Sequence, residues 1–172
     1  MNKKISIIIP VYNSSKNLEI LINSLILNLK KNFENYEIIL VDDLSTDGSW
    51  SIVEKFCADN DYIKGIQLRK NVGQHNAIFS ALKYCNGEVI ITMDDDGQNS
   101  ADDIIKLVDE LNNGYDICYA NYKNKKHNLF RKFGSQINNI VASALFNKPI
   151  NLTLTSFRCF KKEIKDEILK YT

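Results

Sequence analysis

Three consecutive carboxylates, Asp94 to Asp96, occupy the stretch ITMDDDGQN directly behind an apolar run. Holding such charges close together costs electrostatic energy and solvation. Hard divalent cations such as Mg²⁺ and Mn²⁺ take oxygen ligands, commonly one or two carboxylates completed by substrate phosphates. In an extended segment, Asp94 and Asp96 would face one side and Asp95 the other. We therefore predict a metal site at Asp94 and Asp96, against the alternative of a solvated acidic turn.

Other polar residues follow neighbouring apolar segments in the same way. Tyr12 and Asn13 come after the first of these segments, and Asp42 and Asp43 close the second. The carboxyl ends of parallel strands meet at one edge of a sheet, which is where open α/β sheets bind ligands. The sequence thus predicts that these residues converge with the acidic triplet on a single crevice.

The elements that must position these residues alternate between two periodicities. Short, β-branched, nearly continuous apolar segments are typical of strands buried on both faces; they span residues 4–12, 36–43, 63–68, 88–96 and 116–120. Apolar residues recur at helical spacing between them, in residues 18–29, 50–57, 77–85 and 104–111. This alternation predicts an α/β fold with a Rossmann-like, doubly wound and mostly parallel sheet.

Particular residues indicate where two of these helices begin and end. We expect Ser100 to cap the helix of residues 104–111, with Asp103 completing a variant of the capping box and Gly114 ending the helix. Gly87 is expected to end the preceding helix as its C′ residue.

The pattern changes after Tyr119. A basic loop leads to an amphipathic helical stripe over residues 129–145, followed by a predicted strand over 152–160 and a helix over 161–171. The stripe fits a core helix or a surface that faces a membrane, because basic residues flank its start.

The composition predicts one globular domain spanning residues 1–172, with truncation at the C-terminus left open. The chain has 172 residues and a formal net charge of +1, which gives no signal for nucleic acid. Four widely spaced cysteines with apolar neighbours indicate reduced thiols rather than zinc ligands. We see no signal peptide and no apolar run long enough for a membrane span, and expect a cytoplasmic protein.

Two other α/β protein classes fit poorly. The first turn, PVYNSSKN, has no glycine, whereas a dinucleotide site needs G-x-G-x-x-G there. In a phospho-receiver domain the acidic pair should follow the first strand, but here it follows the second.

The motifs ISIIIPVYN, IILVDDLSTDGS, NVGQHNA, GEVIITMDDDGQN, FRKFGS and SFRCF occur in this order along nearly the whole chain. Together they resemble family 2 glycosyltransferases with the GT-A fold. The sequence is most similar to the branch that moves sugars onto dolichol or undecaprenyl phosphate. The resemblance implies a metal-dependent, inverting transfer from a nucleotide-sugar donor, with UDP as the expected leaving group.

The resemblance also assigns roles to single residues. Pro10, Tyr12 and Asp43 match nucleotide-binding positions, with Asp43 expected at the base and Asp42 beside it. We predict that three further residues also bind the substrate: Asn13, Gln74 and Asp95.

The remaining matches concern catalysis and the acceptor. Asp94 and Asp96 match the metal-binding aspartates and, with Gln98, form the expected catalytic set, which requires Mg²⁺ or Mn²⁺. Three more residues match positions near the acceptor phosphate, which arginine can bind bidentately; they are Arg131, Ser135 and Arg158.

A polyprenyl phosphate needs no general base, since it is already largely ionised near neutral pH. We interpret His75 as a structural residue or a diphosphate contact rather than a base. Such an acceptor would require peripheral attachment to the inner face of the cell membrane, and a homo-oligomer is left open. The alternatives are a transferase for a polysaccharide acceptor, a sugar-phosphate nucleotidyltransferase, and a binding or scaffold domain without catalysis.

Overall fold

The computed structural model of this chain describes residues 3–97, 99–120 and 155–170. The strands are β1 Ile5–Val11, β2 Tyr36–Asp42, β3 Ile63–Gln67, β4 Val89–Thr92, β5 Ile117–Tyr119 and β6 Arg158–Lys161. The helices are α1 Ser15–Asn32, α2 Ser49–Asp59, α3 Gln74–Leu82, α4 Ala101–Asn112 and α6 Lys162–Lys170. Some sequence predictions lie outside the described residues; these concern Gln98, Arg131, Ser135 and the stripe 129–145.

The strands form one sheet in the order β3-β2-β1-β4-β6-β5. The pairs β1–β2, β1–β4 and β2–β3 are parallel, which confirms the expected doubly wound, mostly parallel arrangement. β6 is antiparallel to both of its neighbours, β4 and β5. The last strand of the described chain is thus inserted between two strands that precede it, which periodicity alone does not predict.

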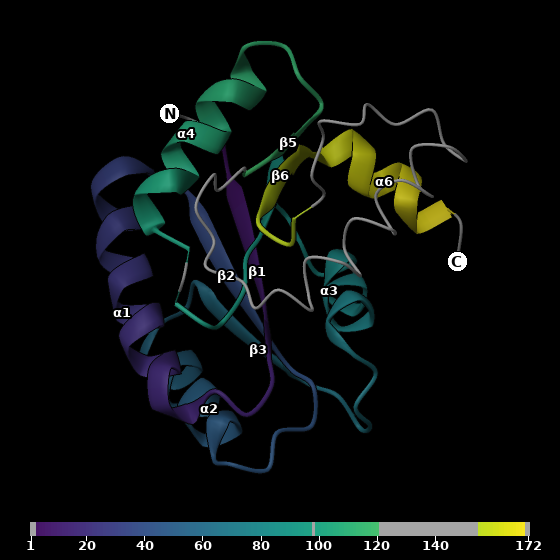
Figure 1. The fold of residues 1–172 in the computed structure, drawn as a ribbon. Coiled ribbons are helices and arrows are strands. Elements are labelled where there is room, and N and C mark those ends of the chain that lie inside the picture. The colour runs from purple at the N-terminus through teal and green to yellow at the C-terminus, as the bar shows by residue number, and fades with distance from the viewer. Residues whose placement is uncertain (1–2, 98, 121–154, 171–172) are drawn as a thin grey trace, which may run out of the picture.

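Helices cover both faces of the sheet (Figure 1). One core cluster joins α1, α2 and α4 to one face, through residues such as Leu25, Val53 and Leu107. A second cluster joins α3 to the other face, where residues of α6 pack against it. Because both faces are covered, β1 and β4 are buried along their whole length. In the edge strand β3 only Ile63 is buried, and the other four residues are partly or fully exposed, in contrast to the burial on both faces expected from the sequence.

The predicted ends of α4 are found. Ser100 caps the helix by accepting a hydrogen bond from the Asp102 backbone N–H, and Gly114 follows it with a φ of 108°. The Asp103 carboxylate bonds Lys106, so the structure supports the Ser100 half of the proposed capping box.

The prediction for Gly87 is wrong. α3 ends at Leu82, five residues earlier than Gly87, whose N–H donates to the Ser6 hydroxyl. A Cβ at this position would lie 2.6 Å from the Ser6 backbone nitrogen. The glycine is therefore required for close packing of two segments, not for ending a helix.

The four cysteines are free thiols, as expected. Cys85 and Cys159 are buried, and burial raises the pKa of each thiol to about 12. Within the described ranges, no helix combines the length and apolar character needed to cross a membrane.

Candidate active site

A cavity of about 400 Å³ lies at the carboxyl ends of β1, β2 and β4, beside the start of α3. We call it the acidic cavity, because four carboxylates line it and the described lining contains no lysine or arginine. The lining residues are Pro10, Val11, Tyr12, Asp43, Asn71, Gly73, Gln74, Asp94, Asp95 and Asp96. Seven of these ten were predicted from the sequence as site residues.

Asp95 ties the loop after β4 to the loop after β1. Its Oδ2 accepts a hydrogen bond of 3.0 Å from the Tyr12 backbone N–H and another from the Ser14 hydroxyl. Burial raises the pKa of Asp95, and the charge of Asp94 raises it further, although the hydrogen bonds from Ser14 and Tyr12 oppose this rise. Asp95 therefore positions Tyr12 at the rim of the cavity while carrying a charge that its surroundings disfavour.

Asp94 joins α3 to the segment that leads into β6. Its Oδ1 accepts from the Gln74 side-chain amide, and its Oδ2 accepts from the Ser156 hydroxyl. A carboxylate offers about four lone-pair sites, so Asp94 can still bind a further partner. These contacts fix the direction in which the Asp94 carboxylate faces the cavity.

Asp43 lines the acidic cavity at the carboxyl end of β2. Its two carboxylate oxygens accept hydrogen bonds of 2.8 Å from the backbone N–H groups of Val72 and Gly73. Gly73 has a φ of 83°, a conformation that a side chain disfavours, and directly precedes α3. Asp43 thereby sets the start of α3 and, with it, the position of Gln74.

Three of the predicted substrate-binding residues that the structure describes do not line the acidic cavity: Arg158, which lines a different cavity, Asp42 and Asn13. Asp42 is fully buried, and its Oδ2 accepts from the Ser45 backbone N–H, while its Oδ1 is buried without a hydrogen-bond partner. Asn13, with a φ of 52°, accepts from the Thr46 backbone N–H. Both residues shape the loop beneath Tyr12 rather than the cavity wall.

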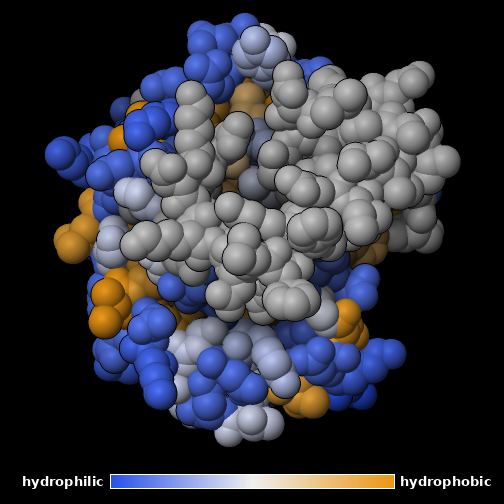
Figure 2. Space-filling model, viewed as in Figure 1, coloured by the Kyte–Doolittle hydropathy of each residue, from blue (hydrophilic) through white to orange (hydrophobic). Residues whose placement is uncertain are grey.

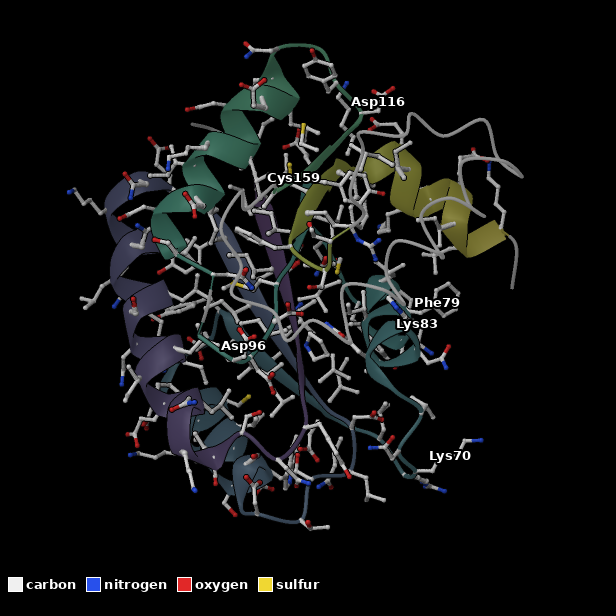
Figure 3. All side chains as sticks on the ribbon, in the orientation of Figure 1. Lys70, Phe79, Lys83, Asp96, Asp116 and Cys159 are labelled. Atoms are coloured by element: carbon white, nitrogen blue, oxygen red, sulfur yellow. The ribbon has the colours of Figure 1, made fainter. Side chains whose placement is uncertain are left out.

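Asp96 is an exposed residue in the loop between β4 and α4 (Figure 3) and lines the acidic cavity. In the same figure Lys70 projects away from Asp96, and it does not line this cavity. In the described part of the chain, no three acidic, histidine or cysteine side chains are grouped so as to hold a metal ion by themselves. The carboxylates present are nonetheless hard oxygen donors of the type that Mg²⁺ and Mn²⁺ share with substrate phosphates.

The geometry of the acidic triplet differs from the expected one. β4 ends at Thr92, so the strand does not extend through Asp94 to Asp96 as the sequence predicted. The turn continues to Gly97, which has a φ of 70°. Asp94 and Asp95 bond different segments because the loop bends, not because strand residues alternate.

Three lining residues were missed by the sequence analysis. Val11, Asn71 and Gly73 all line the acidic cavity. The glycine in NVGQHNA, directly before a helical pattern, was a usable signal for the last two. His75 lies on a different cavity, together with Arg158.

This sheet order, with carboxylates gathered at the carboxyl edge, defines a glycosyltransferase fold of the GT-A type. The solved structures that resemble the chain have this fold. Glucosyl-3-phosphoglycerate synthase from Mycobacterium tuberculosis, in complex with Mn²⁺, UDP-glucose and phosphoglyceric acid, matches with a TM-score of 0.73 and 16% identity, over 94% of this chain and 58% of that one. A mannosyltransferase from Pyrobaculum calidifontis, in complex with GDP-mannose and Mn²⁺, matches with a TM-score of 0.69 and 18% identity, over 98% and 47%.

The chain belongs to the family described as Glycosyl transferase family 2, whose sequence profile matches residues 6–169. It is 34% identical over 169 residues to the undecaprenyl-phosphate 4-deoxy-4-formamido-L-arabinose transferase of Photorhabdus laumondii subsp. laumondii. That alignment covers 98% of this chain but 51% of the relative, so the chain spans about half the relative's length. The sequence-based identification of the family is confirmed.

Proposed function

We propose that this chain acts as a metal-dependent, inverting glycosyltransferase that moves a sugar from a UDP-sugar to a polyprenyl phosphate. The observation that carries this proposal is the acidic cavity, where four carboxylates surround a space with no cationic side chain in its described lining. Such a site repels a bare diphosphate and attracts one that arrives with a divalent cation. Family membership and the relative that acts on undecaprenyl phosphate support the same assignment.

The chain's own residues bind and orient the donor. Tyr12 is 52% exposed at the rim of the cavity, so its ring is available to a flat nucleobase. Asp43, held by two backbone N–H groups, presents fixed acceptor oxygens to the same cavity. A divalent metal shared by Asp94, Asp96 and the diphosphate would neutralise the charge of the leaving group.

The reaction is a displacement at the anomeric carbon of the donor sugar. The bond from that carbon to the diphosphate oxygen breaks as a bond to an oxygen of the acceptor phosphate forms, with inversion. A phosphate monoester needs no general base, because it is largely ionised near neutral pH. This agrees with the position of His75 outside the acidic cavity. A polyprenyl acceptor would place the protein at a membrane surface.

Asp96→Asn tests the proposal most directly. We expect Mn²⁺-dependent binding of UDP, measured by calorimetry, to weaken at least tenfold, and transfer from a panel of UDP- and GDP-sugars to undecaprenyl phosphate to fall by about 100-fold or more. Asp61→Asn is the matched control, because Asp61 is an exposed aspartate in the turn before β3, at the opposite edge of the sheet. Unchanged turnover of Asp96→Asn would refute the proposal, and release of pyrophosphate from a nucleoside triphosphate would identify a nucleotidyltransferase instead.

A further inference from the structure

A cavity of about 530 Å³ lies between α1 and the loop that joins β4 to α4. We call it the α1-loop cavity. It shares Asp96 with the acidic cavity, while its other described lining residues differ from those of the acidic cavity. The two helices α1 and α4 lie on the same side of the sheet (Figure 1). The α1-loop cavity is therefore a neighbour of the proposed donor site with a lining of its own.

One wall of the α1-loop cavity is a stripe of α1. Asn17, Ile20 and Ser24 follow one another at helical spacing, and all three line the cavity. Ile20 is 72% exposed, and Figure 2 shows apolar residues among polar ones on the side of the molecule where α1 lies. This wall thus combines an exposed apolar side chain with side chains that donate and accept hydrogen bonds.

The loop contributes a buried amide to the lining. Asn99 lines the cavity and is 5% exposed. Its Oδ1 and its Nδ2 are both buried without a hydrogen-bond partner among the described residues. A buried polar group without a partner costs about 1–3 kcal/mol, so such groups are normally paired. The Asn99 side chain thus calls for a partner that the described part of the chain does not supply.

The loop does not need Asn99 for its own conformation. The N-cap of α4 is Ser100, whose hydroxyl accepts a hydrogen bond from the Asp102 backbone N–H. The left-handed position of the loop is Gly97, with a φ of 70°, and Asn99 is not among the described non-glycine residues with a positive φ. Neither the helix cap nor the backbone conformation requires an asparagine at this position, whereas a ligand in the cavity would account for it.

The charge of the lining narrows the class of ligand. Its described residues include one carboxylate, that of Asp96, and no lysine or arginine. An anion would meet this carboxylate with no cation in the described lining to offset it. A hard metal ion binds oxygen atoms, so it would leave the Nδ2 of Asn99 unpaired. The lining therefore favours a neutral ligand that both donates and accepts hydrogen bonds.

A saccharide meets these requirements. Because each hydroxyl is both a donor and an acceptor, two adjacent hydroxyls can donate to the Oδ1 and accept from the Nδ2 of one amide. A carboxylate offers about four lone-pair sites, so Asp96 can accept from a further hydroxyl. The C–H face of a sugar ring can cover Ile20. The cavity volume also lies within the roughly 300–1,000 Å³ that is usual for small-molecule sites.

The position of the cavity distinguishes this saccharide from the sugar of the donor. Under the proposed function, the anomeric carbon of the donor faces an acceptor phosphate expected near Arg158. Arg158 lines a cavity together with residues of α3 and α6, which pack on the opposite face of the sheet from α1. The donor sugar would therefore extend from the acidic cavity towards α3 and α6, and would leave the α1-loop cavity to another saccharide.

We infer that the α1-loop cavity binds a neutral saccharide, separate from the donor, whose adjacent hydroxyl groups are held by the Asn99 amide. The separation from the donor rests on the proposed function, but saccharide binding as such does not. Because Asp96 lines both cavities, the bound saccharide would lie next to a nucleotide sugar in the acidic cavity.

An NMR titration of the ¹⁵N-labelled 172-residue chain tests the inference without metal or nucleotide. The probes are the methyl glycosides of glucose, galactose and mannose. We expect at least one of them to shift the side-chain amide signals of Asn99 saturably, with a dissociation constant of about 1–10 mM, the affinity that a few hydrogen bonds provide. The 6-phosphate of the same sugar should bind at least about fivefold more weakly because of Asp96. Calcium chloride should leave the Asn99 signals in place.

Asn99→Leu removes the amide and keeps a side chain of similar size. Binding of the glycoside, followed through the backbone signals of Ser24 and Gly97, should weaken about tenfold or more. The midpoint of urea unfolding should stay the same or rise, because a buried unpaired amide is removed. A lower midpoint with unchanged glycoside binding would show that Asn99 is structural and would refute the inference.

Ser24→Arg tests the cavity at an exposed position of α1 where arginine favours the helix. The long side chain would fill the cavity and should weaken glycoside binding at least about fivefold. Asn23→Arg is the matched control, because Asn23 is the adjacent exposed residue of α1 and lies outside the described lining. It introduces the same charge and should bind the glycoside as the wild type does.

Four results would overturn the inference: no shift of Asn99 with any glycoside, tighter binding of the sugar phosphate, a saturable shift of Asn99 with calcium, or wild-type binding in Ser24→Arg. A competition tests the separation from the donor, with UDP-glucose, UDP-galactose or GDP-mannose matched to the glycoside, in the presence of Mg²⁺. Displacement of the glycoside by the nucleotide sugar, but not by UDP or GDP, would assign the cavity to the donor and would also refute the inference. Failure of the Asp96→Asn test with glycoside binding intact would remove the transferase proposal and leave the saccharide site.

Discussion

Carboxylates at the two edges of the sheet lie in opposite electrostatic surroundings. At the amino edge Glu37, on β2, is 3% exposed and is surrounded by donors. Its carboxylate bonds Lys64 at 2.7 Å and Ser6 at 2.6 Å, and it accepts from the Asn86 backbone N–H at 2.6 Å. At the carboxyl edge, the carboxylates of the acidic cavity have polar partners but no described lysine or arginine beside them.

The pKa values reflect this difference. Burial alone would raise the pKa of Glu37, but the hydrogen bonds from Lys64, Ser6 and Asn86 outweigh it and lower the pKa from 4.5 to about 2. Burial raises the pKa of Asp95 and its partners do not fully offset this. At the amino edge, the negative charge of Glu37 is thus balanced by Lys64 and by hydrogen-bond donors. At the carboxyl edge, the described lining of the acidic cavity does not balance the charge of its carboxylates, and a bound cation would neutralise it.

Neutralising Glu37 should have the largest effect on stability. We expect Glu37→Gln to lower the free energy of unfolding by about 2–3 kcal/mol near neutral pH, because Lys4, Lys64 and Ser6 lose their ionised partner. Urea unfolding measures this. Glu19→Gln is the control, because its pair with Lys55 is exposed and is expected to contribute under about 1 kcal/mol.

The pH dependence of the unfolding free energy tests whether the charge of Glu37 causes this stabilisation. The folded-state pKa of Glu37 is lowered, so its stabilisation is fully present above about pH 4.5 and is lost as the pH falls towards 2. The stability difference between wild type and Glu37→Gln should therefore shrink over this range. A difference that stays constant down to pH 2 would show that packing, not charge, makes the amino edge stable.

The sequence predicted the layers of the fold well because its periodicity is a local property. A continuous β-branched run such as residues 36–43 is buried on both faces and forms a parallel strand, whereas the run of residues 116–120 forms β5, which is antiparallel to β6. The place of β6 between β4 and β5 could not be predicted, since strand order depends on pairing between distant residues. The error at Gly87 has the same origin, because Ser6, which makes the glycine necessary, lies 81 residues away.

The candidate site was predictable to the extent that strand ends define it. Tyr12, Asp43 and Asp94 all follow strands that run parallel within one sheet, so their convergence follows from topology. The hydrogen bond from Ser156 to Asp94 spans 62 residues and depends on the antiparallel strand, which the sequence did not place. The sequence therefore could not predict the direction in which each carboxylate points, but it did predict the edge of the sheet on which each carboxylate lies.

Asp43→Asn should have an intermediate effect, on stability and on binding together. The amide offers one acceptor oxygen, so either the Val72 or the Gly73 N–H would face an NH₂ group. We expect a loss of about 1–2 kcal/mol in unfolding free energy, measured in urea, and weaker UDP binding by calorimetry.

Asp47→Asn is the matched control, since Asp47 also accepts from two backbone N–H groups, those of Ser15 and Ser49, but lies off the acidic cavity. It should lose stability and keep UDP binding; equal loss of binding in both variants would contradict a direct role for Asp43.

Asp95→Asn should have the smallest effect on stability, and one of opposite sign to Glu37→Gln. The amide oxygen can still accept from Tyr12 and Ser14, while the charge beside Asp94 is removed. Because the folded-state pKa of Asp95 is raised, the wild type loses stability as the pH rises through that pKa, and the variant should not. We therefore expect thermal unfolding near neutral pH to show the variant equal to the wild type or up to about 1 kcal/mol more stable.

Mn²⁺-dependent UDP binding should weaken in the same variant, because the cavity attracts the cation less strongly. If Asp95→Asn destabilised the protein as much as Glu37→Gln does, the charge of Asp95 would be compensated by its neighbours within the protein. The negative charge of the carboxyl edge would then not indicate a cation site.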